Sequence, residues 1–276
     1  MSESESSMPD GADRTRMNNH RHAGRWSLKR LVLALGTVAG LCAAYTVYAA
    51  VNPNALWHIV HERCILAPAG QPPAPCAEVD ARAGYAVLKD RVGVGQYLLI
   101  PTRRITGMED PAITRADAPD YFAYAWQQTA RLNHHLAHAL PGEDMALAIN
   151  SAHGRSQNQL HIHIDCLRPD VKQALQHAVP TLGAAWTPLP LYGHAYRAWL
   201  VRSESLSGIR PFYMLARDMA DPAHEMGEHT LVVAGVVRPD GRHGFVVLDD
   251  RVDPRHNDRA SGEELQDHTC QLQNAP

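Results

Sequence analysis

Apolar residues follow two different patterns along this chain. Between residues 31 and 51 they form one uncharged run of 21 residues without a polar face. As a helix this run would be about 31 Å long, which matches the hydrocarbon core of a bilayer. After residue 51 the apolar stretches are short, and they either alternate with polar residues or recur at helical spacing. The pattern predicts one membrane-spanning helix followed by a domain of short strands and helices.

The later part of the chain combines strand patterns with helix patterns. Strand-like runs form three predicted hairpins, at residues 84–89 with 97–100, 145–149 with 157–165, and 230–237 with 244–251. Helical spacing covers residues 54–64, 120–140, 171–179 and 211–219. Ser261 and Glu264 have the spacing of a capping box, which predicts a last helix carrying Asp267 and His268. We therefore expect an α+β fold, an antiparallel sheet with flanking helices.

The strictest alternation of polar and aliphatic residues lies at residues 160–165. A period of two places His161, His163 and Asp165 on one face of a strand and the aliphatic residues on the other. Two neighbouring imidazoles on one face can bind a metal ion, form part of a solvated sheet face, or carry out nucleophilic chemistry at phosphorus. The pattern alone leaves these three interpretations open.

Charge orients the predicted membrane helix. Six basic residues and no acidic one lie between Arg14 and Arg30, so the positive-inside rule keeps residues 1–30 in the cytoplasm as a disordered basic tail. Residues 31–51 then form a single-pass anchor, and residues 52–276 form an exported, periplasmic domain. The alternative is a cleaved signal peptide ending at Val47-Tyr48-Ala49, but the apolar run is longer than the core of such peptides.

Overall composition narrows the class of partner. The formal net charge of −3 and the pI of about 6.6 give no reason to expect nucleic acid as a partner. About 225 residues follow the predicted anchor, which is enough for one large domain with a substantial core or for two small lobes.

Separated motifs of the chain resemble those of one protein family. They comprise Cys64, residues 75–79 (PCAEV), 84–90 (GYAVLKD), 97–102 (YLLIPT), Gln157-Asn158, 161–170 (HIHIDCLRPD) and 266–270 (QDHTC). Together they resemble the bacterial CDP-diacylglycerol pyrophosphatases, a membrane-anchored branch of the histidine triad superfamily. The segment from Asn150 to Asp165 is similar to the superfamily signature, in which an Asn, a Gln and an alternating histidine motif lie along one hairpin.

The resemblance implies an active site in residues 150–165, and these residues can be aligned with the superfamily signature in two registers. The ungapped register makes His163 the nucleophile, with Asp165 at a third position where a carboxylate would repel phosphate unless it were protonated or turned away. The other register places Gln159 first and makes His161 the nucleophile. The expected substrate contacts are Asn150, Gln157, Asn158, Arg103 and Arg104.

The cysteines agree with export. Cys42 lies in the apolar run, which leaves Cys64, Cys76, Cys166 and Cys270 as an even set. Of the three possible connectivities we expect Cys64–Cys76 and Cys166–Cys270. Four free thiols are the alternative if the domain is not exported.

The resemblance also implies the reaction. Histidine would attack the nucleotide phosphorus of CDP-diacylglycerol without a metal or other cofactor, and water would then release CMP. The expected partners are a liponucleotide at the surface of the bacterial inner membrane and the membrane itself. Alternatives are a hydrolase or nucleotidyltransferase acting on soluble nucleotide pyrophosphates, and a periplasmic metal-binding module that uses His161 and His163.

Overall fold

The computed structural model describes residues 52–68 and 70–274 of this 276-residue chain. The described residues from Pro53 onward belong to one compact unit. The expected basic tail and membrane span at residues 1–51 lie outside the described residues. Within the described residues, no helix is both long and apolar enough to cross a bilayer.

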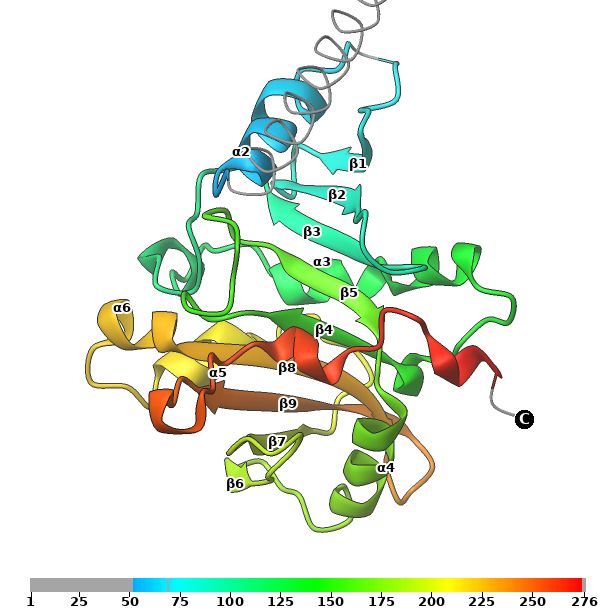
Figure 1. Ribbon diagram of the computed structural model, residues 1–276, viewed down its shortest axis with the longest axis vertical. Coiled ribbons are helices and arrows are strands. Elements are labelled where there is room, and N and C mark those ends of the chain that lie inside the picture. The colour runs from blue at the N-terminus through cyan, green and yellow to red at the C-terminus, as the bar shows by residue number, and fades with distance from the viewer. Residues whose placement is uncertain (1–51, 69, 275–276) are drawn as a thin grey trace, which may run out of the picture. The chain divides into compact units, whose positions relative to one another are not determined.

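One antiparallel sheet organises the described part of the chain (Figure 1). Its strand order is β1-β2-β3-β5-β4-β8-β9-β7-β6, and each neighbouring pair is antiparallel. The strands are β1 (Cys76–Asp80), β2 (Tyr85–Lys89), β3 (Tyr97–Pro101), β4 (Met145–Ile149), β5 (Ile162–Cys166), β6 (Thr187–Pro188), β7 (Arg197–Val201), β8 (His229–Val237) and β9 (His243–Arg251). The α+β prediction is confirmed, as are the hairpins β2–β3 and β8–β9.

Short helices flank the sheet. The α-helices are α2 (Ala55–Ile59), α3 (Tyr121–Gln127), α4 (Pro169–Ala178), α5 (Pro211–Ala216) and α6 (Pro222–Glu225), and α2 continues as a π-helical turn over Val60–Cys64. The 3-10 turns are Pro111–Ile113, Thr129–His135, Gly142–Asp144, Met226–Glu228, Pro254–His256, Gly262–Leu265 and Gln271–Asn274.

Each face of the sheet has its own core. On one face, Ile162 and Ile164 of β5 belong to a cluster that includes Phe122 of α3 and Phe212 of α5. The opposite face of β4 and β8 packs against Val171 and Leu175 of α4 and against Leu265. In Figure 1 the C-terminal segment, drawn red, crosses this second face in front of β4 and β8. The polar residues of β5 therefore lie on the face that the C-terminal segment approaches.

Two predicted helices differ from the structure. The helix expected over residues 120–140 begins at Asp120, whose side chain accepts from Ala123 N, but changes to a 3-10 helix after Gln127. Thr129 is one cause, because its hydroxyl donates to the Trp126 carbonyl, 2.8 Å away, and such local side-chain bonds compete with the helix. The capping-box prediction at Ser261 is wrong: its hydroxyl contacts Asn150 Oδ1, and the helix is a single 3-10 turn that ends before Asp267.

Both predicted disulfides are confirmed. Cys64–Cys76 joins the end of the π-helical turn to β1, and Cys166–Cys270 joins the end of β5 to the C-terminal segment. β1, β6 and β7 are not among the strands predicted from the sequence; β6 has only two residues, and β7 shows no regular alternation of polar and apolar residues.

Candidate active site

The two histidines lie at the start of β5, between β3 and β4. His163 is opposite Leu98 on one side and Ala148 on the other, so a small residue adjoins the imidazole. His161 immediately precedes β5, and the two rings meet edge to face with centroids 4.8 Å apart. Both side chains are buried. The alternation predicted from the sequence therefore brings both imidazoles to one place.

Gln159 fixes the chain just before this pair. Its Nε2 donates to the carbonyls of Pro101 and Arg103, at 3.0 and 2.9 Å. The Gln159 carbonyl in turn lies 2.7 Å from His161 Nδ1. A backbone carbonyl can only accept, so this contact requires the proton of neutral His161 on Nδ1. The Nε2 lone pair of His161 is then free for attack.

The surroundings of His163 are different. Gln96 Nε2 lies 2.9 Å and Glu263 Oε1 lies 3.0 Å from His163 Nδ1. A donating amide favours an unprotonated Nδ1, whereas a carboxylate favours a protonated one, so these two neighbours favour opposite states. The other ring nitrogen, Nε2, is buried with no hydrogen-bond partner.

Burial keeps both imidazoles neutral. It lowers the pKa of His161, and it lowers the pKa of His163 to well below the usual value, with the neighbouring His161 adding to the effect. A neutral imidazole is the form that can attack phosphorus. The pair is therefore ready to act near neutral pH.

Glu263 connects the predicted Asn150 to the histidines. Its Oε2 accepts from Asn150 Nδ2 at 2.6 Å, and its backbone N–H donates to Asn150 Oδ1 at 3.2 Å. Gly262 allows the segment to approach this closely, because a Cβ there would come within 2.6 Å of both Thr230 Oγ1 and Val232 Cγ2. Close packing of the C-terminal segment on β8 thus places Glu263 beside His163.

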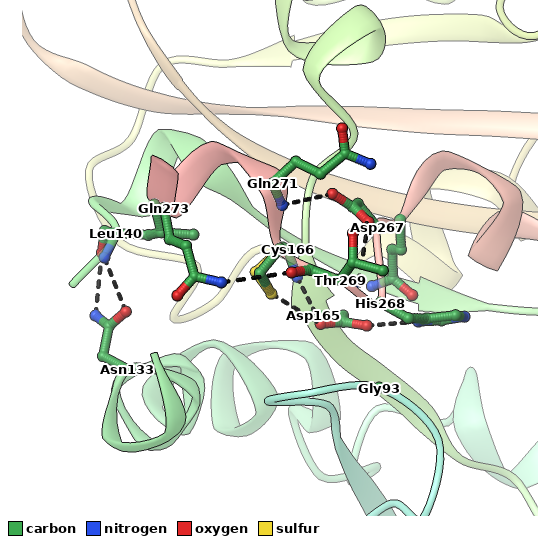
Figure 2. Close-up of a disulfide and its surroundings, with 12 residues drawn as sticks. Gly93, Asn133, Leu140, Asp165, Cys166, Asp267, His268, Thr269, Gln271 and Gln273 are labelled. Atoms are coloured by element: carbon green, nitrogen blue, oxygen red, sulfur yellow. Dashed lines mark hydrogen bonds and ion pairs between the residues drawn. A yellow bond between two sulfur atoms is a disulfide. The ribbon is translucent and has the colours of Figure 1, made fainter. Parts of the chain in front are cut away.

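Asp165, the third polar residue of the strand, is fully buried. Its Oδ2 lies 2.6 Å from His268 Nδ1, and its Oδ1 accepts from Cys166 N at 2.9 Å. Figure 2 shows this pair beside the Cys166–Cys270 disulfide. The carboxylate that departs from the triad pattern is therefore turned toward an imidazole from the C-terminal segment.

The other predicted substrate contacts lie toward the N-terminal end of the domain. Gln157 Oε1 accepts from Leu56 N at 3.1 Å, and the Asn158 backbone N–H donates to the Pro53 carbonyl at 2.5 Å. Arg104 contacts the Asn54 side chain, and its guanidinium lies 5.3 Å from the centroid of the Trp57 ring. The side chain of Arg103 is exposed, while its carbonyl accepts from Gln159. The contacts of Gln157, Asn158 and Arg104 thus join the segment before β5 and the end of β3 to residues 53–57.

Sequence reasoning missed Gln96 and Glu263. Gln96 precedes β3 and is fully buried, so a lone polar residue at the start of an apolar strand was the available signal. Glu263 lies 100 positions after His163, and no spacing rule relates them.

Metal-ligating groups gather elsewhere among the described residues. Possible ligand atoms of His194, Asp250 and Asp258 lie within 4.8 Å of one another. The same holds for Asp165, Cys166 and Cys270, but there both sulfurs are joined in the disulfide. Within the described residues, neither His161 nor His163 belongs to such a group of three.

Comparisons with known proteins identify the family of this chain. The sequence model of a family described as CDP-diacylglycerol pyrophosphatase matches residues 51–274. A protein of Yersinia pestis named CDP-diacylglycerol pyrophosphatase is 43% identical over 224 residues, which cover 80% of this chain and 85% of that protein. The family match therefore spans all of the described residues.

Proposed function

This chain belongs to the CDP-diacylglycerol pyrophosphatase family of hydrolases, and on that premise we propose that it cleaves CDP-diacylglycerol to CMP and phosphatidate. The observation that carries the mechanism is the pair of buried neutral imidazoles, one of which has its Nδ1 held by a carbonyl. Such a group can act as a nucleophile without prior loss of a proton.

The proposed reaction has two displacements at the cytidylyl phosphorus. His161 Nε2 forms a bond to this phosphorus while the bond to the bridging oxygen breaks, and phosphatidate leaves with that oxygen. Water then attacks the same phosphorus and releases one proton to bulk solvent, the N–P bond breaks, and CMP leaves with the neutral imidazole restored. Covalent catalysis of this kind divides one slow hydrolysis into two easier steps.

The choice of His161 differs from the ungapped register of the sequence, which favours His163. The carbonyl at His161 Nδ1 fixes one tautomer, whereas His163 Nδ1 has neighbours that favour opposite ones. With Gln96 donating to Nδ1, the proton of His163 lies on Nε2, and this N–H can donate to a phosphate oxygen. The register that begins at Gln159 accounts for both roles, and we propose a histidine triad arrangement in that register.

The same proposal covers the location of the enzyme. The uncharged run at residues 31–51 would anchor the chain in the bacterial inner membrane, with the catalytic domain in the periplasm. The two disulfides support export, because such bonds persist in oxidising compartments. A tethered domain would meet the diphosphate of a liponucleotide at the membrane surface.

The test is hydrolysis of CDP-diacylglycerol in detergent micelles by full-length protein treated with a chelator. We expect wild type to release CMP and, after acid-free quenching, to carry an acid-labile cytidylyl group. His161→Ala should abolish both the adduct and turnover. His163→Ala should still form the adduct, but at least about tenfold more slowly, because a phosphate contact is lost.

Three other outcomes would count against parts of the proposal. An adduct that is lost only in His163→Ala would make His163 the nucleophile. Activity removed by chelator and restored by a metal ion would favour a metal-dependent reaction. Cleavage of soluble nucleotide diphosphates at equal or greater kcat/KM would favour a soluble substrate.

A further inference from the structure

His268 lies beside β5, although it comes from the C-terminal segment. Three contacts hold it there: its carbonyl accepts from Val94 N at 2.9 Å, its Nδ1 is 2.6 Å from Asp165 Oδ2, and a disulfide joins Cys270 to Cys166. Figure 2 shows the contact with Asp165 and the disulfide. The turn before β3 packs closely on it, since a Cβ on Gly93 would come within 3.3 Å of His268 Cβ. Its imidazole is thus fixed from several sides.

The Nε2 atom of His268 faces the candidate site. His268 Nε2 lies 3.9 Å from Glu263 Oε1, the same oxygen that lies 3.0 Å from His163 Nδ1. At 3.9 Å no hydrogen bond forms. The side chain is 34% exposed, so a ligand from solvent can reach it. In the described part of the chain, Nε2 is a donor position beside the catalytic histidines that no protein group fills.

The charge of His268 suits an anionic ligand. Its hydrogen bond to Asp165 raises the pKa of His268 above the usual value, with Glu263 and Asp90 acting in the same direction. Burial of the imidazole acts in the opposite direction. Asp267 is the adjacent acidic group, and His163 is a nearby imidazole whose own pKa is lowered by His268. The imidazolium form therefore persists to higher pH than that of a free histidine.

We propose that His268 is a further substrate-binding residue, donating from Nε2 to a non-bridging oxygen of the substrate diphosphate, with Asp165 as its positioning residue. This inference rests on the proposed function. It also explains the carboxylate at a position where the sequence predicts repulsion of phosphate. Asp165 meets an imidazole and not the substrate, and the cation needed at that place is supplied from the other end of the chain.

The test measures kcat/KM for CDP-diacylglycerol as a function of pH, from about pH 5.5 to pH 8.5, for wild type and three variants. Full-length protein in mixed micelles is used throughout. His268→Asn retains a donor near the position of Nδ1 but loses Nε2, and we expect kcat/KM at neutral pH to fall about 10- to 100-fold. The alkaline decline that wild type shows as His268 deprotonates should be absent from this variant.

The Asp165→Asn variant tests the contribution of the Asp165 carboxylate. It leaves the imidazole in place but removes the charge that raises its pKa, so the alkaline decline should move to lower pH. Activity lost near pH 8 should then be regained near about pH 6. His243→Asn, which removes an exposed imidazole at the start of β9, is the control and should match wild type.

The outcomes separate this inference from the proposed function. Wild-type cleavage together with an unchanged kcat/KM and pH profile in His268→Asn would overturn the role of His268 alone. A folded wild type that does not cleave CDP-diacylglycerol would overturn the proposed function. If His268→Asn fails to fold, Asp165→Asn decides, because an unshifted alkaline decline in a folded variant contradicts the pairing argument.

Discussion

His161 and His163, at the start of β5, differ in the groups that contact their Nδ1 atoms. A carbonyl fixes the proton of His161 on Nδ1, whereas an amide and a carboxylate approach Nδ1 of His163. Burial lowers the pKa of both. At the scale of a residue, the proposed roles of nucleophile and donor rest on hydrogen-bond partners and not on residue type.

A second cluster of buried carboxyl groups, Asp250 and Asp258, should make the stability of the protein depend on pH. Asp250 and Asp258 are both buried, and Asp250 Oδ2 has no hydrogen-bond partner. Burial, together with the neighbouring Asp258, raises the pKa of Asp250 to about 7. The folded protein therefore holds a proton that the unfolded chain releases near pH 4, so stability falls as pH rises between about 4 and 7 and stays lower above 7.

Asp250→Asn removes this ionisation. We expect the melting temperature of the variant, relative to wild type, to rise by a few degrees between about pH 4.5 and pH 8. Circular dichroism melts at several pH values measure this difference. Asp249→Asn is the matched control: Asp249 pairs with Arg197 at 2.6 Å, so its loss should lower the melting temperature. A difference for Asp250→Asn that does not change with pH would contradict the argument.

Among the elements, the C-terminal segment is the one that completes the candidate site. It supplies Glu263 from a 3-10 turn and His268 from the turn that follows, which the hydrogen bond from Cys270 N to the Asp267 carbonyl closes. Neither position depends on a regular helix, because Gly262 permits close contact with β8 and a disulfide fixes Cys270 to β5. The segment is held by packing and by a covalent link.

The two disulfides should therefore differ in effect. Cys166–Cys270 spans 104 positions and Cys64–Cys76 spans 12. Loop-closure entropy predicts a loss of about 5 kcal/mol in unfolding free energy for Cys166→Ser/Cys270→Ser and about 3 kcal/mol for Cys64→Ser/Cys76→Ser. Urea unfolding followed by fluorescence measures both values.

Activity distinguishes the two pairs further. Under conditions where both double variants remain folded, kcat/KM should fall only when the Cys166–Cys270 bond is missing, because His268 then loses its tether. Equal kcat/KM values for the two variants would show that packing alone holds the segment.

At the scale of the whole molecule, the proposed topology is the main prediction. If residues 31–51 anchor the chain with the N-terminus in the cytoplasm, protease added to intact spheroplasts should digest the domain and leave a tag on residue 1 protected. Immunoblotting for the tag measures the protected fragment. Protection of the domain in intact spheroplasts, with digestion only after lysis, would reverse the topology.

Much of the architecture could be predicted from local sequence. The hairpins β2–β3 and β8–β9 follow from strand periodicity around turn residues, and α4 follows from helical spacing. At Thr129 and Ser261, side-chain hydrogen bonds compete with helix formation. There the local patterns predicted longer helices than the structure has. The outcome there depended on hydrogen bonds that periodicity does not report.

The sequence by itself determined that His161, His163 and Asp165 share one face, because strand geometry imposes a period of two on any residues placed there. It also predicted which cysteines pair. Only the tertiary structure decided what surrounds these side chains. Gln96, Glu263 and His268 come from segments 67 to 103 positions away from the histidine or aspartate that each contacts. Such contacts arise from sheet order, a close approach at Gly262 and a disulfide, and none of these leaves a periodic signal along the chain.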